Sequence, residues 1–438
     1  MKKNLMLYAF DSELWNEVSR ELSNNYNINN VKQLDLKLLG AFHLDKENHI
    51  APSRVNLNQD DLIMYNQLVA RRGTYYNSFP MVRDEFYYFI KLSEEMLSKS
   101  GVDCLVFQNL PHEGFDYILY RVAQELEIKT VICHQSIFSN RFYIFDTIDD
   151  YGYFKTSVKS DYPPVDLEKY FEEGLCYMKG IAGFSPLPEL IYYKFRDLID
   201  RVSFKKLRKK GYFRHRALKL IEGIDNYVYK KRKAEFFSAN LQNLVNDKVK
   251  YVYFPLHQQP ELTTSILGKE YEDQVLAIEH LAKLLPDEVK IVVKDNPRQD
   301  NRYRSSSFFN RLMSIKNVIL IHSSTPSHKL LEHSICSATI SGTIAWESAV
   351  ENKYCIVFGH TWYMGLDNVL ELSDLKDKST DDIYNLISSE VKFEHTACNK
   401  IFSKMPVGIV DDFYLRGVDG FSYQSNAKLV AAAIECNI

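Results

Sequence analysis

The residues best suited to chemistry in this chain follow a short apolar stretch in its second half. Residues 251–254, Tyr-Val-Tyr-Phe, have the β-branched and aromatic character of a buried strand, and Pro255 and Pro260 end that pattern because proline donates no backbone hydrogen bond. His257 and Glu261 lie in the loop that follows. Histidine can transfer protons near neutral pH, and a carboxylate can act as a nucleophile or a base. Ligands of open α/β sheets bind beyond the carboxyl ends of strands, so this loop is a candidate active-site floor.

Polar residues follow two further apolar stretches at the same relative position. Residues 289–293 lead into Lys-Asp-Asn-Pro-Arg at 294–298, and residues 338–340 lead into Ser-Gly-Thr-Ile-Ala-Trp-Glu at 341–347. Parallel strands present their carboxyl ends at one edge of a sheet. The three loops are therefore expected to line a single cleft.

The segment after the third stretch has the features of an anion site at a helix start. Gly342 precedes Thr343, and the free backbone N–H groups and helix dipole at such a start favour a phosphate. Glu347 falls on the same helix face as Thr343, where its carboxylate could accept hydrogen bonds from ribose hydroxyls. An ordinary helix cap and a surface acid are the alternatives. Ser323 and Ser324 are further phosphate ligands or simple turn residues.

Alternating strand and helix patterns in both halves must position these loops. Strands are expected at 5–10, 104–108, 130–133, 251–254, 290–293, 318–321, 338–340 and 354–358. Helices are expected at 115–126, 273–285, 327–333 and 343–351. This alternation predicts an α/β fold with two Rossmann-like domains facing a central cleft. The expected domains are 1–240 and 241–438, and an apolar helix at 427–434 could cross back to the first domain.

Length and composition are those of a large globular protein. The chain has 438 residues, of which 45% are hydrophobic and 25% charged, and this length suits two domains. It has no run of 18 apolar residues and no signal-peptide pattern at its start, so a cytoplasmic protein is expected. Its seven cysteines include no Cys-x-x-Cys pair, which argues against a zinc site and a disulfide framework. No glycine-rich dinucleotide or P-loop motif is present.

One segment, residues 194–233, is strongly basic. It contains 15 Lys or Arg residues against four acidic ones, a balance of +11 in a chain whose net charge is −3. Aromatic residues alternate with cations between 204 and 216, which suits an anionic surface such as the inner face of the cytoplasmic membrane. A solvated helical face is the alternative. Nucleic acid is not an expected partner, because no zinc-finger, RNP or helix-turn-helix pattern accompanies the segment.

Three segments together resemble a known family. They are Phe-Pro-Leu-His-Gln-Gln-Pro-Glu at 254–261, Val-Val-Lys-Asp-Asn-Pro at 292–297, and residues 339–363, which contain Ser-Gly-Thr-x-x-Trp-Glu. In order and spacing they are similar to bacterial capsule polysaccharide synthesis proteins, which include retaining transferases of 3-deoxy-D-manno-octulosonic acid (Kdo). The resemblance implies a GT-B fold, a CMP-activated ulosonic acid held by the C-terminal domain, no metal ion and a carboxylate nucleophile.

Two departures from the family pattern affect the donor. Asn296-Pro297 stands where the family has a His-Pro pair that contacts the nucleotide phosphate, and Glu261 stands where it has an aspartate nucleophile. The expected donor is therefore CMP-Kdo or a CMP-linked nonulosonic acid such as pseudaminic or legionaminic acid. Lys294 and Arg298 are expected to neutralise its phosphate or carboxylate. A solvated strand-end lysine is the alternative for Lys294.

The acceptor side is expected on the first domain. His112, Glu113 and Gly114 follow a strand pattern and precede a helix, and this His-Glu-Gly sequence is similar to the acidic loop of bacterial sialyltransferases. His112 and Glu113 are therefore candidate bases for an acceptor hydroxyl, although Glu113 could instead cap the helix. Further candidates for acceptor binding are His134, Gln135 and Asp11.

These interpretations define one set of candidate residues. The candidate catalytic residues are Glu261, His112, Glu113 and His257. The candidate donor-binding residues are Lys294, Asn296, Pro297, Arg298, Ser323, Ser324, Ser341, Gly342, Thr343 and Glu347. The predicted function is a retaining, cofactor-free transfer of an ulosonic acid from CMP to a polysaccharide or glycolipid acceptor. A transferase using a UDP-sugar, a sugar-nucleotide epimerase and a non-catalytic glycan-assembly protein are the alternatives.

Overall fold

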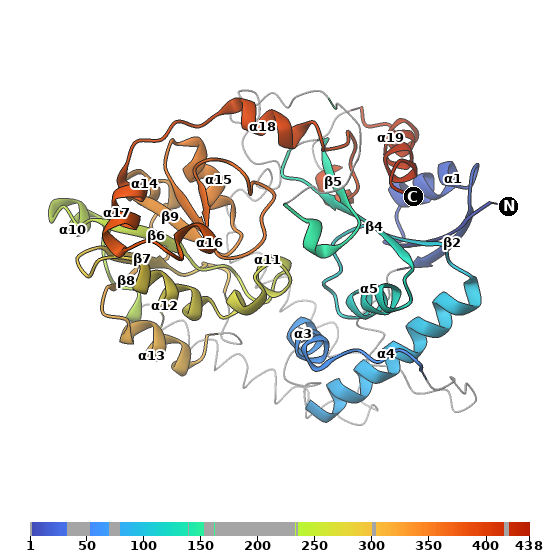
Figure 1. Cartoon of the computed structure of the whole chain (residues 1–438), viewed down its shortest axis with the longest axis horizontal. Coiled ribbons are helices and arrows are strands. Elements are labelled where there is room, and N and C mark those ends of the chain that lie inside the picture. The colour runs from blue at the N-terminus through green and yellow to red at the C-terminus, as the bar shows by residue number, and fades with distance from the viewer. Residues whose placement is uncertain are drawn as a thin grey trace, which may run out of the picture.

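The structure consists of two α/β lobes, each built on its own sheet (Figure 1). It is a computed structural model that describes residues 2–32, 53–69, 79–138, 140–152, 162, 233, 235–299, 304–415 and 420–438. Both sheets are mainly parallel and alternate with helices along the chain. The predicted mixed α/β class with parallel sheets is therefore confirmed.

The N-terminal lobe contains a five-stranded sheet in the order β2-β1-β3-β4-β5. Its strands are β1 (Asn4–Ala9), β2 (Asn27–Lys32), β3 (Cys104–Phe107), β4 (Lys129–Gln135) and β5 (Phe142–Phe145). Only the β4–β5 pair is antiparallel. Alternate residues of β1 pack into different cores: Met6 and Tyr8 face one side, and Leu5 and Leu7 face the other. The sheet is therefore covered on both faces.

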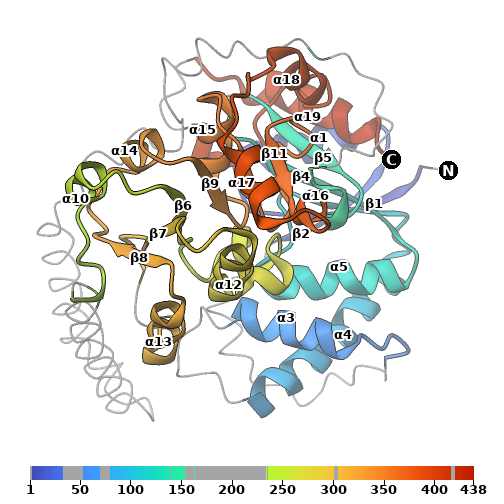
Figure 2. The ribbon, with the colours of Figure 1, turned by 60° about the vertical axis from the view of Figure 1, so that its left-hand side comes forward.

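Helices cover both faces of this sheet. They are α1 (Glu13–Leu22), α3 (Gln59–Val69), α4 (Phe79–Ser100) and α5 (Phe115–Glu125), with the 3-10 turn η2 (Ile148–Asp150). Helices α3, α4 and α5 pack together below the sheet in both views (Figures 1 and 2). Helix α1 lies on the opposite face and is capped by Ser12, whose hydroxyl accepts the Trp15 N–H.

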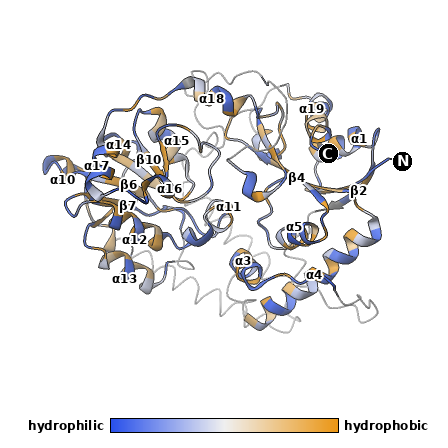
Figure 3. Cartoon of the chain, in the orientation of Figure 1, coloured by the Kyte–Doolittle hydropathy of each residue, from blue (hydrophilic) through white to orange (hydrophobic). Residues whose placement is uncertain are grey.

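The C-terminal lobe contains a six-stranded parallel sheet in the order β11-β10-β9-β6-β7-β8. Its strands are β6 (Tyr251–Pro255), β7 (Lys290–Lys294), β8 (Val318–Ile321), β9 (Cys336–Thr339), β10 (Cys355–Val357) and β11 (Val369–Glu371). Figure 3 shows apolar residues concentrated in the interior of this lobe. A parallel sheet buried on both faces needs such near-continuous apolar strands, which is why the sequence pattern identifies β6 and β7.

Short helices connect these strands. They are α10 (Leu241–Asn246), α11 (Leu262–Ser265), η4 (Lys269–Glu272), α12 (Gln274–Leu284), α13 (Ser306–Ser314), α14 (Ser327–Glu332), α15 (Thr343–Val350), α16 (Leu372–Leu375) and α17 (Thr380–Ser388). Helix α15 is apolar through most of its length, with Ile344, Ala345 and Trp346 buried. This burial fixes the helix against the sheet and sets the position of its N-terminus.

After α17 the chain returns to the N-terminal lobe. The returning elements are α18 (His395–Phe402), η6 (Asp412–Leu415) and α19 (Tyr423–Glu435). Helix α18 lies over the junction of the lobes, and α19 packs against α1 (Figure 1). The backbone of Val410 is bonded by three side chains of the N-terminal lobe: its carbonyl accepts from Trp15 Nε1 at 2.9 Å and Gln108 Nε2 at 3.1 Å, and its N–H donates to Gln135 Oε1 at 2.8 Å.

A hydrophobic core crosses the boundary between the lobes. Phe138, which follows β4, lies with its ring centre 6.0 Å from that of Trp346 in α15 and 5.2 Å from that of Trp362. Its ring is also 4.9 Å from Phe402 in α18. The two lobes therefore share buried aromatic packing on this side of the molecule.

Residues 194–232 of the basic segment, and residues 161 and 163–188 of a proline-containing stretch, lie outside the described residues. Lys233 is described, and it is buried rather than presented to solvent. Within the described ranges, no helix is long and apolar enough to span a bilayer.

Candidate active site

Three adjacent strands bring the predicted donor-side residues to one edge of the C-terminal sheet. Strands β9, β6 and β7 are neighbours and run parallel, so the residues that follow them leave the sheet on the same side. Pro255 lies opposite Lys294 in the β6–β7 register, and the Leu256 N–H donates to the Lys294 carbonyl at 2.8 Å. The three loops therefore meet, as the sequence predicts.

Lys294, at the end of β7, is fixed by a hydroxyl at the start of α14. Its Nζ donates to Ser327 Oγ at 2.9 Å, and the Tyr253 hydroxyl donates to the same oxygen at 3.2 Å. Burial lowers the pKa of Lys294 from its ordinary value. The ammonium group is therefore held in a partly dehydrated position, where an anion would interact with it more strongly than in open solvent.

Glu347 lies on α15, one turn after the helix start. Its Oε1 accepts from Thr343 Oγ1 at 3.3 Å. Burial and, to a lesser extent, the charge of Glu351 raise the pKa of Glu347, while the Thr343 hydrogen bond acts in the opposite direction. Its charge also acts on Tyr253, which places Glu347 near the Lys294 group. A half-buried carboxylate beside a helix N-terminus is suited to accept ligand hydroxyls.

His257 is held against the start of α15. Its Nε2 lies 2.9 Å from Thr339 Oγ1, which also accepts the Gly342 N–H at 3.2 Å. A Cβ on Gly342 would lie 3.0 Å from His257 Cε1, so glycine allows this close approach. Burial and the nearby charge of Arg304 lower the pKa of His257 to about 4. His257 is therefore neutral at neutral pH, and its contacts favour a structural role over the predicted proton transfer.

A buried ion network fixes the loop that carries His257. Asp295 is fully buried, with Arg304 Nε 3.4 Å from its Oδ1 and Lys233 Nζ 2.5 Å from its Oδ2. Arg304 also donates to Gln259 Oε1 at 2.6 Å and to the His257 carbonyl at 2.9 Å. One carboxylate thus joins the loop after β6 to the loop after β7.

Most of the other predicted donor residues have structural contacts of their own. Asn296 Oδ1 accepts the Arg298 N–H at 2.9 Å, and Pro297 and Arg298 are exposed. Ser341 Oγ donates to the Thr263 carbonyl at 2.6 Å, which ties the start of α15 to α11. Ser323 and Ser324 follow the edge strand β8, and Ser324 Oγ lies 2.6 Å from His322 Nδ1. The structure thus places these two serines farther along the sheet edge than Lys294.

Glu261 begins the short helix α11. Its carbonyl accepts the N–H groups of Thr264 at 3.1 Å and Ser265 at 2.9 Å, and its half-buried side chain does not cap the helix. Helix α11 contacts α3 of the N-terminal lobe. Nearby, Gln67 Nε2 of α3 donates to Glu272 Oε2, and burial together with the charge of Asp273 raises the pKa of Glu272 to about 7. Glu261 therefore lies where the lobes face each other.

His112 and Glu113 form an ion pair before α5. Their Nε2 and Oε1 atoms are 3.3 Å apart, and His112 Nδ1 lies 2.6 Å from the Leu110 carbonyl. Burial alone would lower the pKa of His112, but the hydrogen bond to Glu113 and the charges of Asp116 and Glu113 outweigh it and raise that pKa. Asp116, in the first turn of α5, fixes the loop before the helix, because its carboxylate accepts the N–H groups of His112 and Glu113 at 2.8 Å each. Glu113 is thus left to pair with His112.

The predicted acceptor-binding residues are not all brought together. His134 Nδ1 lies 2.5 Å from Asn109 Oδ1, and burial together with the charge of His112 lowers the pKa of His134 to about 3. Gln135 is buried and bonds the Arg141 carbonyl and the Val410 N–H, which gives it a structural role. Asp11 is exposed beyond β1.

Sequence reasoning missed several residues that organise both sides of the site. On the donor side they are Tyr253, Ser327, Thr339, Arg304 and Lys233, and on the acceptor side Asp116 and Asp411. Asp116 offered a usable signal, because an acid in the first turn of a predicted helix is stabilised by the helix dipole and the free N–H groups near the helix start. The charge of His112 acts on Asp411, so the returning segment also borders the acceptor side.

Comparison with known proteins gives a family match over slightly more than half of the chain. A family model described as capsule polysaccharide biosynthesis protein matches residues 164–388. No curated protein gives a significant match to this chain.

Several solved structures are similar to this chain at low sequence identity. Thermosulfurimonas dismutans KpsC, a beta Kdo 2,7 transferase, is 9% identical with a TM-score of 0.36, over 99% of this chain and 100% of that chain. A UDP-GlcNAc 2-epimerase from Methanocaldococcus jannaschii is 14% identical with a TM-score of 0.28, over 92% of this chain and 98% of that chain. S. aureus MnaA with UDP is 12% identical with a TM-score of 0.24, over 91% and 94%. At these TM-scores, none of the three similarities decides between a Kdo transferase and a UDP-GlcNAc 2-epimerase.

Proposed function

Because this chain belongs to the capsule polysaccharide biosynthesis protein family, we propose that it is a retaining glycosyltransferase. In this proposal it moves an ulosonic acid, Kdo or a nonulosonic acid such as pseudaminic or legionaminic acid, from CMP to a polysaccharide or glycolipid acceptor. The basic segment 194–233 would bring the enzyme to an anionic membrane surface, although Lys233 itself is committed to Asp295. The reaction takes place on the cytoplasmic side, and no metal ion takes part in it.

The observation that carries the proposal is the pairing of a cation with a carboxylate at the carboxyl edge of one sheet. Lys294 and the N-terminus of α15 supply positive potential for a phosphate, and Glu347 supplies acceptors for ribose hydroxyls. The α15 turn contributes three residues, Gly342, Thr343 and Glu347, to this cradle. These are the groups that a nucleoside monophosphate requires.

The proposed reaction has two displacements at the anomeric carbon. A carboxylate oxygen of Glu261 attacks that carbon, the bond to the CMP phosphate oxygen breaks, and CMP leaves with the electron pair, stabilised by Lys294. The acceptor hydroxyl then attacks the same carbon, its proton passes to Glu113, and the bond to Glu261 breaks. Glu113 is the base in this scheme, and His112, whose pKa is raised by the hydrogen bond to Glu113, holds the Glu113 carboxylate in place.

A covalent adduct is the direct test of this scheme. Intact-mass spectrometry of the protein mixed with CMP-Kdo should show one added sugar, and peptide mapping should place it on Glu261. Glu261→Gln should lower transfer by at least about a thousandfold while CMP binding persists, because a nucleophile acts only along the reaction path. Glu347→Ala, on the donor side, should weaken CMP binding in calorimetry without moving the adduct.

The outcomes separate the proposal from other activities. Turnover of a UDP-sugar without an acceptor would indicate an epimerase. Absence of any nucleotide binding would indicate an assembly protein. An adduct on a residue other than Glu261, or inversion at the anomeric carbon of the product, would contradict the assigned nucleophile.

A further inference from the structure

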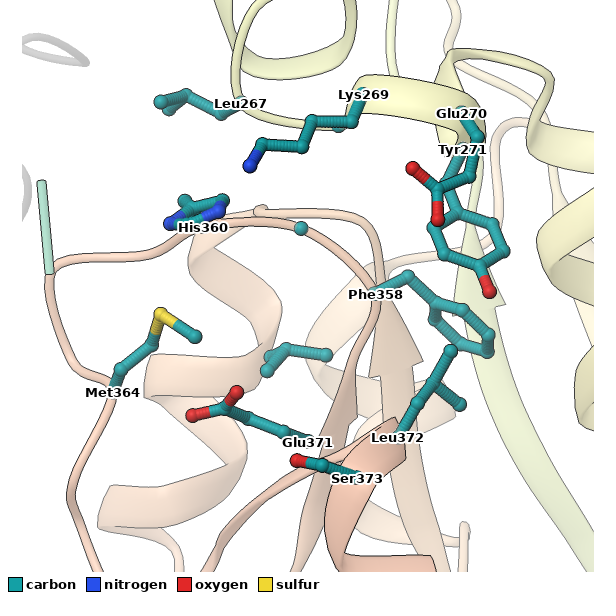
Figure 4. A pocket seen from close by; sticks show the side chains of 13 residues that line it. Leu267, Lys269, Glu270, Tyr271, Phe358, His360, Met364, Glu371, Leu372 and Ser373 are labelled. Carbon is teal, nitrogen blue, oxygen red and sulfur yellow. The ribbon is translucent and has the colours of Figure 1, made fainter. Parts of the chain in front are cut away.

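A cavity of about 390 Å³ opens at the carboxyl ends of β10 and β11 (Figure 4). One wall is the segment that follows α11, including Lys269, Glu270 and Tyr271. The opposite wall is the start of α16, where Glu371 and Ser373 lie. A volume of this size lies in the range of small-molecule sites and accommodates one or two sugar rings.

This cavity is separate from the proposed donor site. It shares none of the donor residues, and it lies on the β10 and β11 side of the loop between β9 and α15. The wall between them is tightly packed: a Cβ on Gly359 would lie 2.5 Å from the Leu267 carbonyl oxygen, and a Cβ on Gly268 would lie 2.4 Å from the Thr264 carbonyl oxygen. The His360 N–H also donates to the Leu267 carbonyl at 2.8 Å. The cavity therefore has a well-defined wall of its own.

The charged groups of the cavity select against an anionic ligand. Glu270 and Glu371 contribute two carboxylates, and Lys269 contributes one ammonium that already pairs with Asp149 of the N-terminal lobe at 3.1 Å. Figure 4 shows Lys269 and Glu270 extending from one wall and Glu371 and Ser373 from the other. Phosphate or carboxylate groups would meet net negative charge, whereas hydroxyl and amide donors would find acceptors.

Glu371 is already oriented for such a role. Its carboxylate accepts a backbone N–H in the first turn of α16, in a capping box with Asp374. This bond fixes the orientation of the carboxylate at the cavity wall. Fixed acceptors reduce the side-chain entropy lost when a polar ligand binds.

The hollow surface continues along the junction of the lobes. A second cavity, of about 250 Å³, shares Met364 with the first, and its lining includes Gly152 of the N-terminal lobe and Lys400 of α18. At the other end, Leu267 of the first cavity follows Glu261 by six positions, and the short helix α11 (Leu262–Ser265) lies between them. An oligosaccharide lying along this path would extend toward Glu261.

We propose that these two cavities form a binding groove for a neutral or N-acetylated segment of the acceptor glycan. This assignment rests on the proposed glycosyltransferase function, and it adds the chemical class of the acceptor units next to the site of transfer. The charge of the first cavity, its size and its continuation toward the second cavity carry the inference.

Saturation-transfer NMR with defined sugars tests the groove. The probes are N,N'-diacetylchitobiose and lactose as non-acidic sugars, and digalacturonate as an acidic one. The non-acidic sugars should receive saturation and digalacturonate should not. Ser373→Trp, which places a large side chain at the cavity wall, should weaken binding of the non-acidic sugars at least about tenfold, and Glu270→Leu should weaken it about tenfold by removing one charged hydrogen-bond acceptor.

A matched control and a separate readout keep the test decisive. Asp377→Trp introduces the same side chain at an exposed position outside the cavity and should bind sugars as the unaltered protein does. CMP binding, measured by calorimetry on the same variants, should be unchanged. If the unaltered protein does not bind CMP, the proposed function is overturned, but the sugar measurement still tests the groove. Equal sugar binding by Ser373→Trp and Asp377→Trp, preference for digalacturonate, or no binding of either non-acidic sugar would overturn the groove.

Discussion

Burial shifts the pKa values of His257 and Glu272 in opposite directions. The two groups therefore make the stability of the protein depend on pH in opposite ways. The pKa of His257 is lowered to about 4 in the folded protein, whereas it is about 6.5 in the unfolded chain. Between these two pH values, the unfolded chain binds a proton that the folded protein does not bind. The contribution of His257 to stability is therefore lost as the pH falls from 6.5 to 4. The pKa of Glu272 rises to about 7, so its contribution is present below about pH 4.5 and is lost as the pH rises to 7.

Two single substitutions should reveal these opposite dependences. In urea unfolding between pH 4.5 and 6.5, His257→Gln should make the free energy of unfolding rise less steeply with pH than in the unaltered protein. Glu272→Gln should make it rise more steeply. Each proton accounts for at most about 1.4 kcal/mol per pH unit. Two variants whose pH profiles run parallel to that of the unaltered protein would show that neither group is shifted in the folded state.

At the scale of elements, a network of buried charges fixes the positions of the loops after β6 and β7. Its members come from several segments of the chain. Arg304 bonds Asp295, Gln259 and the His257 carbonyl, and Lys233 bonds Asp295 from a segment that precedes the sheet. Removal of one member would leave a buried charge only partly compensated. The network should therefore determine both the stability of this lobe and the placement of the residues next to Glu261.

Substitution of Arg304 should be far more costly than substitution of a similar exposed arginine. Arg304→Met should lower the free energy of unfolding by about 3–5 kcal/mol, because it leaves buried Asp295 with a single cation. Arg311→Met is the matched control: Arg311 is 44% exposed and pairs with Asp273 and Glu279 on the surface, so its loss should cost less than about 1 kcal/mol. Denaturant unfolding measures both values. Similar small losses would mean that solvent reaches Asp295.

The same elements show what the sequence can and cannot predict. Strands β6 and β7 were predictable because burial on both faces requires continuous apolar residues, and their observed ends differ from the expected ones by one residue. Strand β2, Asn-Ile-Asn-Asn-Val-Lys, was missed because it is a polar edge strand without that pattern. Lys294 was predicted at the strand end, but its bond to Ser327 joins positions 33 residues apart, and no local pattern encodes such a pairing.

Long-range contacts also explain why some candidate site residues have structural contacts in place of the expected ligand contacts. Gln135 has the residue type and position of a ligand-binding side chain, yet it bonds the returning chain at Val410, 275 positions away. Lys233 cannot be distinguished by sequence from the other cations of the basic segment, although in the structure it pairs with the buried carboxylate of Asp295. Such roles depend on which segments the fold brings together, and a single sequence does not specify that directly.

At the scale of the whole molecule, the shared aromatic core should make the two lobes unfold together. Phe138 packs against Trp346 and Trp362 of the C-terminal lobe and against Phe402 of α18. Trp346 and Trp362 are two of the three tryptophans, so fluorescence reports mainly on this junction, whereas circular dichroism reports on both lobes. Coincident transitions by the two probes are expected for one cooperative unit.

Truncation of Phe138 should destabilise that unit as a whole. Phe138→Ala should lower the free energy of unfolding by about 3–5 kcal/mol, the usual cost of a large cavity, and should begin to separate the two transitions. Phe309→Ala removes a ring that is also buried but lies within the C-terminal lobe. It should lower stability without separating the fluorescence transition from the circular-dichroism transition. Two well-separated transitions in the unaltered protein would contradict a shared core.

The attachment of the returning segment to the N-terminal lobe has a consequence for synthesis on the ribosome. Trp15 and the carbonyl of Val410 that accepts its hydrogen bond are 395 positions apart. At about 5–20 residues per second, the ribosome needs roughly 20–80 s to add that interval. During this time the face of β1 and α1 that packs against α19 has no α19 to cover it, so the N-terminal lobe is completed only after the C-terminal lobe has been made. Throughout this interval the nascent N-terminal lobe therefore exposes apolar surface of the kind that chaperones bind.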